Sequence, residues 1–291
     1  MILVVGGTGV LGRQLVSDLV AQGEQVRVLA RGVQPFPREW PDAVERVAGD
    51  LGSAEDCDRA VRGCTKVVFA ASGFGLPSGG DPRSVDRDGA IRLIGAAAAS
   101  GVEHVVMMSM HGAAADGAID LLRCKFAAEE ALKSSGMAWT IIRMGVLLEQ
   151  WIQVLSGPLQ EKGTVTIFGS GTAPVTFTTL ADASAIVRRA LADPALRGRV
   201  LEWGSETHTL REVAEALIAQ AGHGTIKTTP TPMLRVMSVV ARPFSPFMAR
   251  MAGASVWMDG GGLHLDVGRA RAEVPDLPVH GLADVLSHAS L

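Results

Sequence analysis

The strongest constraint on the fold is a glycine-rich turn close to the start of the sequence. The apolar run Ile2–Val5 passes directly into Gly6-Gly7-Thr8-Gly9-Val10-Leu11-Gly12, and residues with helical spacing follow at once. In such a unit the first glycine permits a tight turn, the second lets a pyrophosphate approach the backbone, and the third packs helix against strand. The helix N-terminus adds unpaired N–H groups and a partial positive charge. The turn therefore predicts a dinucleotide site formed by Gly6, Thr8, Gly9, Val10, Leu11 and Gly12.

The residues after the last glycine separate this turn from other phosphate-binding loops. The P-loop of an NTPase requires Gly-Lys-Ser or Gly-Lys-Thr, whereas this chain continues as Gly12-Arg13-Gln14. A glycine triplet alone is a weak signal, but here strand, turn and helix occur in the required order. The sequence therefore favours a dinucleotide turn over an NTPase site and over a turn without function.

Short apolar runs alternate with helical segments through the first half of the chain. Leu11, Leu15 and Leu19 repeat every four residues, which is helical spacing, and Gly23 marks the end of that helix. Because each crossover helix must pack back onto one face, this alternation indicates a parallel sheet. We expect an α/β fold with a Rossmann-type, doubly wound parallel sheet. Its strands are expected at Ile2–Val5, Val26–Ala30, Val44–Ala48, Val67–Ala71, Val105–Ser109 and Trp139–Arg143.

The alternation of strand-like and helical segments ends after about Gly145, where glycine and proline become frequent. We interpret 1–145 as the nucleotide-binding domain and 146–291 as a smaller substrate-binding lobe. Strand-like pieces recur at Val175–Thr179 and Val200–Trp203, and we expect one or two of the pieces in this half to return to the Rossmann sheet.

Charge and cysteine content limit the binding partners, metal sites and cellular locations to be expected for the protein. A formal net charge of −3 gives no electrostatic reason to expect a nucleic acid or an anionic membrane as partner. Cys57, Cys64 and Cys124 match no zinc spacing, and their odd number argues against a disulfide framework, so we expect no metal site and a cytoplasmic location. The first strand begins at Ile2 without a basic leader, and no apolar run is long enough for a membrane span.

The end of the second predicted strand indicates which dinucleotide is bound. NAD sites carry an acidic residue about 20 positions past the glycines, but here Arg31 follows nineteen residues after Gly12. A guanidinium can hold a 2′-phosphate through two hydrogen bonds, and no carboxylate is present to repel it. The sequence therefore predicts NADP(H) as cofactor, with a surface arginine of no such role as the alternative.

At this point the chain resembles the atypical, NmrA-like branch of the short-chain dehydrogenase/reductase superfamily over roughly residues 2–220. The resemblance is carried by the turn from Gly6 to Gly12, Arg31, Gly49-Asp50-Leu51, Val85-Asp86-Arg87-Asp88-Gly89, Gly101-Val102-Glu103-His104, Lys125 with Ala128-Glu129, Thr140-Ile141-Ile142-Arg143, Phe177 to Asp182, and Thr209 to Ala214. It implies that Asp50 and Leu51 lie beside the adenine and that Lys125 bonds the nicotinamide ribose. Similar proteins include quinone and triphenylmethane reductases and also NADP-sensing regulators that catalyse nothing.

Further cofactor contacts are expected at the ends of two later strands. Ala70, Ala71 and Ser72 are small residues that would let the cofactor lie close to the backbone. Met144 and Gly145 follow the sixth predicted strand and are expected at the same edge of the sheet.

The residue pattern of the usual short-chain dehydrogenase site is incomplete. That site uses Tyr-x-x-x-Lys on one helix face, where the phenol protonates a reduced carbonyl. This chain contains no tyrosine, and Leu121 occupies the position four residues before Lys125. Lys125 is therefore either a cofactor and proton-relay residue or a solvated lysine paired with Glu129 one turn later.

Two polar residues near the fifth predicted strand are candidates for the missing chemistry. Ser109 would end that strand on the side where open α/β sheets bind ligands, and it could bond a substrate oxygen or a neighbouring backbone group. His111 follows two residues later and is a candidate acid, because imidazole titrates near neutral pH. Phe74 and Trp151 are expected to line the substrate pocket.

An intact NADP(H) site without tyrosine favours hydride transfer to an acceptor that needs little help from a protein acid. We expect a reductase of a bulky apolar small molecule, such as a quinone or an enone. The alternative is a non-catalytic NADP(H)-binding regulator or assembly factor; a sugar epimerase would need the tyrosine. The methionine-rich stretch from Thr228 to Met258 could be a lid over the substrate, core packing or a homodimer contact.

Overall fold

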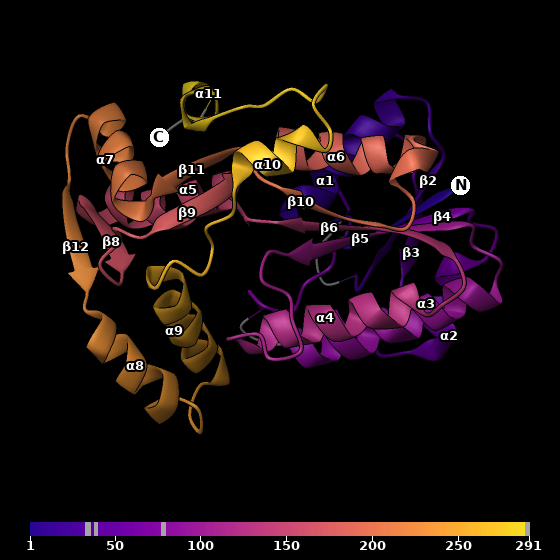
Figure 1. The fold of residues 1–291 in the computed structure, drawn as a ribbon, viewed down its shortest axis with the longest axis horizontal. Coiled ribbons are helices and arrows are strands. Elements are labelled where there is room, and N and C mark those ends of the chain that lie inside the picture. The colour runs from indigo at the N-terminus through magenta and orange to yellow at the C-terminus, as the bar shows by residue number, and fades with distance from the viewer. Residues whose placement is uncertain (33–35, 38–39, 77–79, 289–291) are drawn as a thin grey trace. The chain divides into compact units, whose positions relative to one another are not determined.

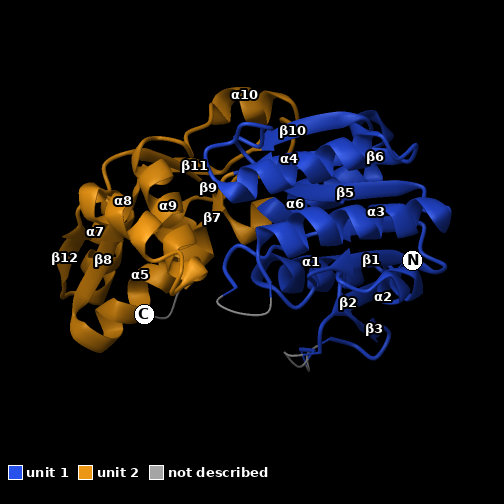
Figure 2. Cartoon of the chain, turned by 90° about the horizontal axis from the view of Figure 1, so that it is seen from below, with its two compact units in different colours: residues 1–144, 183–202 blue, residues 145–182, 203–291 orange. Residues whose placement is uncertain are grey.

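The computed structural model describes residues 1–32, 36–37, 40–76 and 80–288, and its chain divides into two compact units. Unit 1 consists of Met1–Met144 and Ala183–Glu202, and unit 2 of Gly145–Asp182 and Trp203–Leu291 (Figure 2). The chain therefore leaves unit 1, returns to it for one helix and most of one strand, and leaves it again.

Unit 1 is built on a seven-stranded sheet with the order β10-β6-β5-β4-β1-β2-β3 (Figure 1). Strands β1 to β6 pair in parallel, with Ile2 opposite both Val26 and Lys66, so the expected Rossmann-type sheet is confirmed. The strand bounds are β1 (Ile2–Val5), β2 (Val26–Ala30), β3 (Glu45–Ala48), β4 (Lys66–Phe69), β5 (His104–Met110), β6 (Ala138–Met144) and β10 (Arg199–Trp203).

Helices cover both faces of this sheet, as Figure 1 shows. One face packs against α2 (Ala54–Val61), α3 (Ala90–Ala99) and α4 (Asp120–Lys133), whose apolar residues share a core with every second residue of the strands. The opposite face carries α1 (Val10–Ala21) and α6 (Leu180–Ala192), which are joined by a hydrogen bond from Ser184 Oγ to Asp18 Oδ2. The short 3₁₀-helix η2 spans Pro194–Leu196.

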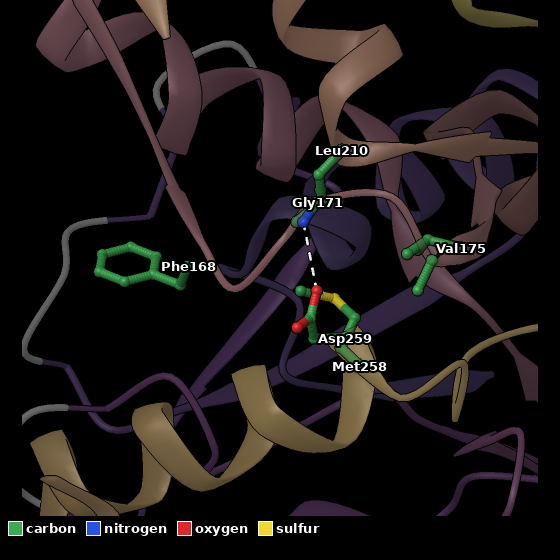
Figure 3. Close-up of a pocket in the computed structure, with 7 residues that line it drawn as sticks. Phe168, Gly171, Val175, Leu210, Met258 and Asp259 are labelled. Carbon is green, nitrogen blue, oxygen red and sulfur yellow. Dashed lines mark hydrogen bonds between the residues drawn. The ribbon is translucent and has the colours of Figure 1, made fainter. Parts of the chain in front are cut away.

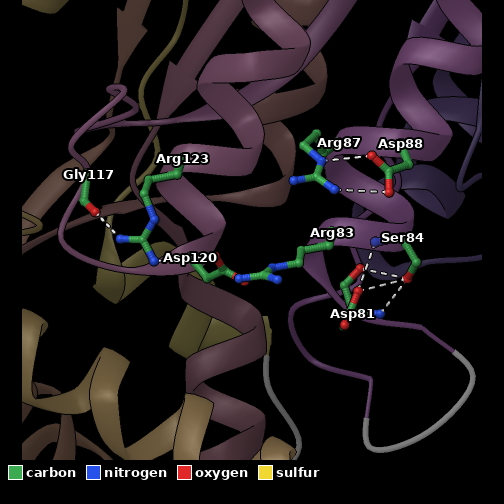
Figure 4. A network of polar contacts seen from close by, with 8 residues as sticks. All are labelled: Asp81, Arg83, Ser84, Arg87, Asp88, Gly117, Asp120 and Arg123. Carbon is green, nitrogen blue, oxygen red and sulfur yellow. Dashed lines mark hydrogen bonds and ion pairs between the residues drawn. The ribbon is translucent and has the colours of Figure 1, made fainter.

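The segment before α3 is a π-helix, η1 (Pro82–Gly89), which packs closely against α4. Asp81 and Ser84 form a capping box at its start, and Arg83 pairs with Asp120 at the start of α4 at 3.1 Å (Figure 4). Arg123 of α4 donates to the carbonyl of Gly117 in the same network. Because π-turns are wider than α-turns and often occur at functional sites, the side chains that η1 directs toward the sheet are of particular interest.

Unit 2 contains two smaller sheets. In the three-stranded sheet, β9 (Pro174–Thr178) pairs antiparallel with β11 (Glu206–Thr209) and parallel with β7 (Val146–Leu147), while β8 (Thr164–Phe168) pairs in parallel with β12 (Thr225–Thr229). The structure thus places β10 in the Rossmann sheet and β9 outside it, so one of the two strand-like pieces returns to that sheet. The cause is local, because β9 finds hydrogen-bonding partners on both edges within unit 2.

The remaining helices of unit 2 are α5 (Leu148–Lys162), α7 (Leu210–Ala221), α8 (Thr231–Val240), α9 (Pro246–Asp259), α10 (Val267–Ala272) and α11 (Leu282–His288). Helices α8 and α9 pack against each other as a hairpin, which contains most of the methionine-rich stretch. Of its apolar residues, Met258 is buried whereas Met233 and Phe244 are exposed. Among the residues that the structure describes, no helix combines the length and the apolar character of a membrane span.

Candidate functional site

The glycine-rich turn connects β1 to α1 in the predicted way. Gly6 has a φ of 84°, which only glycine adopts readily, and its carbonyl accepts the N–H of Gly9 at 3.0 Å. Helix α1 begins after Gly9 with no side-chain cap and no acidic residue in its first turn. The first N–H groups of this helix therefore remain for a ligand, and its positive end favours an anion.

Close packing explains why glycines are needed here. A Cβ on Gly12 would lie 2.1 Å from the carbonyl oxygen of Gly6, and one on Gly6 would lie 2.8 Å from the backbone nitrogen of Ala71. A Cβ on Gly7 would meet the side chain of Val28 at 2.6 Å. The turn is thus packed closely against Val28 of β2 and Ala71 after β4, and such a close-packed glycine turn fits the pyrophosphate of a dinucleotide.

The ends of β2 and β3 lie beside the turn in the sheet order. Arg31 follows the last residue of β2 and is exposed. It occupies the position at which NAD-binding proteins carry an acidic residue. The chain after β3 is tied to β2 through the N–H of Gly49, which donates to the carbonyl of Ala30 at 3.0 Å. Asp50 accepts the N–H of Gly52 at 2.6 Å and shapes the turn before α2.

Leu51 and the residues after β4 border the same edge. The carbonyl of Leu51 accepts a hydrogen bond from Arg92, which fixes the loop after β3 against helix α3. Ala70 continues the strand ladder by donating its N–H to Val5 at 2.9 Å. Ser72 is exposed and accepts the N–H of Phe74, whose ring is half-buried. The topology therefore brings the predicted cofactor residues of β1 to β4 to one edge of the sheet.

Lys125 is buried, and its ammonium group is part of an ion pair. Its Nζ lies 2.9 Å from Oδ1 of Asp86 on η1 and donates to the carbonyl of Met108 on β5 at 3.0 Å. The second carboxylate oxygen of Asp86 accepts the N–H of Gly73 after β4 at 2.8 Å. The ring of Phe69 lies 5.8 Å below the ammonium. The ammonium has three N–H donors, so it can bind a ligand in addition to Met108.

The alternative of a solvated lysine paired with Glu129 is wrong. The side chain of Lys125 is only 8% exposed, and Glu129 is bound to other residues. Leu121, one turn earlier, is buried at 6% exposure and cannot donate a proton. Helix α4 thus keeps the lysine of the family pattern and replaces the tyrosine by a core residue.

Glu129 forms a second buried charge cluster with Ser109 and Arg143. It is fully buried, accepts the hydroxyl of Ser109 at 2.5 Å, and pairs with the guanidinium of Arg143 at 2.6 and 3.0 Å. The hydrogen bond to Glu129 raises the pKa of Arg143 and outweighs burial, which by itself would lower it. Because the only proton of Ser109 points to Glu129, its oxygen is left as an acceptor and not as a donor to substrate.

His111 lies just past the end of β5, and one nitrogen of its imidazole contacts a carboxylate. Its Nδ1 is 2.9 Å from a carboxylate oxygen of Glu202 on β10, and its backbone N–H donates to the carbonyl of Met144 at 3.0 Å. Met144 is the last residue of β6, and the following Gly145 packs closely, since a Cβ there would lie 2.0 Å from the carbonyl of Thr176. Nε2 of His111 is the nitrogen that remains for another partner.

Trp151, predicted to line the substrate pocket, lies half-buried on α5 in unit 2. A cavity elsewhere in unit 2 has a volume of about 10 Å³ and is bordered by residues that include Phe168, Gly171 and Asp259 (Figure 3). Such a volume holds one water molecule at most, so this cavity is not a substrate pocket. Burial opposes ionisation of Asp259, but hydrogen bonds from Thr231 and the loop that contains Gly171 outweigh it and lower the pKa of the carboxyl group.

Two functional candidates escaped the sequence analysis as individual residues. The sequence points to Asp86 only through a family motif, and to Glu129 only through such a motif and as a possible partner of a solvated Lys125. A usable signal was present in α4, where Lys125 and Glu129 fall on the face that also carries Leu121, Leu122 and Ala128. Charges one turn apart on an apolar helix face indicate buried pairs with residues elsewhere in the fold.

Comparisons with known proteins identify the family of the chain. The model of the NAD(P)H-binding family matches residues 6–167. The (4-alkanoyl-5-oxo-2,5-dihydrofuran-3-yl)methyl phosphate reductase of Streptomyces griseus is 32% identical over 73% of this chain and 71% of its own length. The NAD(P)H azoreductase of Xenophilus azovorans is 30% identical over 76% of this chain and 74% of its own. The photosystem II assembly factor Ycf39 of Trieres chinensis is 28% identical over 84% of this chain and 76% of its own length.

Solved structures show the same fold at low sequence identity. The triphenylmethane reductase of Citrobacter sp. has a TM-score of 0.78 at 19% identity, with full coverage of both chains. An NADPH-dependent quinone oxidoreductase of Escherichia coli has a TM-score of 0.76 at 20% identity, with 99% of both chains covered. These similarities extend over both units and confirm the fold predicted from the sequence. The family match and relatives of 30% identity or more, among them the two reductases above, establish that the chain belongs to the NAD(P)H-binding family.

Proposed function

We propose that this protein is an NADPH-dependent reductase that transfers hydride to a bulky apolar acceptor, a quinone or an enone. The observation that carries the proposal is the intact dinucleotide turn beside a helix on which Leu121 stands one turn before the buried Lys125. A quinone or an enone delocalises the electron pair that arrives with the hydride, so reduction proceeds without a phenol to protonate the oxygen in the same step.

The residues of the chain have separate tasks in this proposal. Bound NADPH supplies the hydride. The turn from Gly6 to Gly12 holds the pyrophosphate, and Arg31 binds the 2′-phosphate through its fork of N–H donors. Lys125 donates to the carbonyl of Met108 and forms an ion pair with Asp86, and it offers a further N–H bond to a hydroxyl of the nicotinamide ribose. His111 is the candidate for delivering the proton through Nε2, since Glu202 engages Nδ1.

The relatives support the same reaction class. The name of the Streptomyces griseus relative describes a reductase of a 5-oxo-2,5-dihydrofuran, which is an unsaturated lactone whose carbon–carbon double bond is conjugated with the carbonyl. The Xenophilus azovorans relative is named for reduction of azo compounds, which also accept hydride into a conjugated system. Both acceptors resemble quinones and enones more than simple ketones in this respect.

The direct test measures NADPH consumption with a panel of quinones, enones and aliphatic ketones, after cofactor binding has been shown by fluorescence titration. We expect turnover with quinones or enones and little turnover with aliphatic ketones. Replacing Lys125 by Met should raise the KM for NADPH, and His111→Asn should lower kcat without changing cofactor binding. Turnover of aliphatic ketones alone would contradict the proposal.

A second candidate function is a non-catalytic NADP(H)-binding regulator or assembly factor. It is favoured by the burial of Lys125, whose ammonium already has two protein partners, and by the likeness to a photosystem II assembly factor. Such a protein should bind NADPH tightly, distinguish it from NADP⁺ and turn over none of the acceptors. The same panel therefore decides between the two functions.

A further inference from the structure

Helix α8 exposes a continuous apolar face. Met233, Val236 and Val240 recur at helical spacing and are 61%, 62% and 59% exposed, and Val239 beside them is 61% exposed. Leu234 is the only buried residue of this helix. Phe244, in the turn between α8 and α9, is 86% exposed. Exposed single apolar residues are ordinary, but five gathered on one helix and its turn form a patch that indicates a binding surface.

The charged residues in the stretch of sequence that contains this apolar patch are all basic. The sequence contains no Asp or Glu between Glu215 and Asp259, whereas Lys227, Arg235, Arg242 and Arg250 lie within that interval. Arg235 and Arg242 are exposed, the first within α8 and the second in the turn that carries Phe244. A chain with a net charge of −3 thus carries a local surface that is apolar and cationic.

The dimensions of the hairpin define how it would meet a lipid bilayer. Helix α8 has 10 residues and α9 has 14, whereas spanning the hydrocarbon core takes about 20. Short helices with an apolar face and flanking arginines lie in the plane of the interface, with apolar side chains in the acyl boundary and cations among the phosphates.

We propose that the α8–α9 hairpin docks this protein on the surface of an anionic lipid bilayer. The docking surface consists of Met233, Val236, Val239, Val240, Phe244, Arg235 and Arg242. The proposal does not depend on the reaction proposed above, because it concerns binding of the protein and not turnover.

The charge pattern favours a bilayer over a second copy of the chain. In a two-fold symmetric dimer the same patch meets itself, so Arg235 and Arg242 would face arginines of the copy. No acidic side chain in residues 216–258 could compensate them. Phosphate headgroups provide the missing negative charge, and each arginine near such a surface strengthens binding several-fold.

The experiment is sedimentation of the full-length protein with vesicles of phosphatidylcholine, with and without phosphatidylglycerol. One double variant, Val236→Asp with Phe244→Asp, removes the apolar anchors. Another, Arg235→Glu with Arg242→Glu, reverses the charge. Val154→Asp on α5 is the matched control, because Val154 is 52% exposed in the same unit but lies outside the docking surface. NADPH titration of every variant checks that unit 1 is intact.

We expect the protein to bind phosphatidylglycerol vesicles and to prefer them over phosphatidylcholine alone. Either double variant should lose about tenfold or more in partitioning, the control should bind like the unmodified protein, and high salt should weaken binding. Absence of a preference for the anionic vesicles would overturn the proposal, as would an equal loss in Val154→Asp. A dimer in analytical ultracentrifugation that Phe244→Asp dissociates would assign the patch to a second copy instead.

Discussion

Helices α4 and α8 depart in opposite directions from the usual division of side chains between core and surface. In α4, Lys125 and Glu129 lie in the core of unit 1 with side-chain exposures of 8% and 0%. In α8, Val236 and Met233 face outward with more than half of their surface exposed. A buried charge must be paired, whereas an exposed apolar side chain needs no partner for the chain to fold.

This difference shows how each departure is tied to the rest of the molecule. The charges of α4 are bound to η1, β5 and β6, so they connect elements that are far apart in the sequence. The exposed apolar residues of α8 contribute little to the free energy of folding. Their contact with water is unfavourable until another surface covers them. The two helices should therefore respond very differently to substitution.

The largest effect is expected in α4 itself. Glu129→Ala leaves Arg143 without its carboxylate and Ser109 without its acceptor, so it should lower the free energy of unfolding by about 3–5 kcal/mol. Urea denaturation measures this loss. The control is Glu130→Ala, because Glu130 is 51% exposed and pairs with Lys133 near the surface, a contact worth about 0–1 kcal/mol. Similar values for both variants would show that the buried cluster is not special.

The second effect tests the close packing of the nucleotide turn. Gly12→Ala places a Cβ where the structure leaves 2.1 Å to the carbonyl of Gly6, which should cost about 1–3 kcal/mol of stability and at least about tenfold in NADPH affinity. Gly95→Ala in α3 is the control, because nothing lies within 4 Å of the place that its Cβ would occupy. This control should stabilise the helix by about 1 kcal/mol and leave NADPH binding unchanged in a fluorescence titration.

A third prediction concerns His104, another buried polar side chain of unit 1. Burial lowers its pKa from 6.5 to about 4, with a further contribution from the charges of Arg197 and Lys66. The folded state therefore disfavours the charged imidazole, and the unfolded chain binds the proton first as the pH falls below 6.5. Stability that is present above pH 6.5 is lost toward pH 4, by about 2 kcal/mol between pH 7 and pH 5.

Urea denaturation at several pH values measures this loss. The comparison variant is His104→Gln, whose amide can keep the hydrogen bond to Thr140 Oγ1 but does not titrate. Its stability should fall less than that of the unmodified protein over the same pH interval. Parallel curves for the two proteins would contradict the assignment to His104.

A fourth prediction tests the specificity of the cofactor. Arg31→Asp replaces a guanidinium by a carboxylate where the 2′-phosphate of NADPH is expected, so the Kd for NADPH should rise by about tenfold or more. The affinity for NADH should change much less, because NADH carries a ribose hydroxyl at that position. Equal losses for the two cofactors in a fluorescence titration would remove Arg31 from the proposed site.

The smallest effect on stability is expected in α8. Val236→Asp should change the free energy of unfolding by no more than about 0.5 kcal/mol, because Val236 is 62% exposed. Thermal or urea denaturation provides the value, to be set against Glu129→Ala. A loss of several kcal/mol would mean that α8 is covered in solution by another part of the protein or by a second copy.

The first six strands of unit 1 were predictable because each carries its signal locally. The apolar run Val105–Ser109 lies within the observed β5, and the turn from Gly6 to Gly12 follows β1 as expected. The partner of Lys125 was not predictable in the same way. Asp86 lies 39 residues away, on a π-helix whose geometry has no simple sequence signature, and the two meet only after η1 packs on α4.

Unit 2 was harder to predict because its short strands have more than one available neighbour. The run Val175–Thr179 has the pattern of a buried strand, but that pattern does not tell which sheet it joins. The net charge of the whole chain was a poor guide as well. It conceals an interval without any acidic residue, and the apolar composition of that interval does not reveal which side chains of α8 face outward.

The order of strands also bears on the synthesis of the chain. Strand β10 pairs with β6 but follows it in the sequence by more than fifty residues, nearly all of which belong to unit 2 or to α6. At about 5–20 residues per second, a ribosome needs several seconds to complete this interval. During that time the outer edge of β6 has no partner strand, and unpaired strand edges promote aggregation. Newly made chains are thus most exposed to misassembly midway through translation, and a gene fragment that stops after Met144 would retain this open edge permanently.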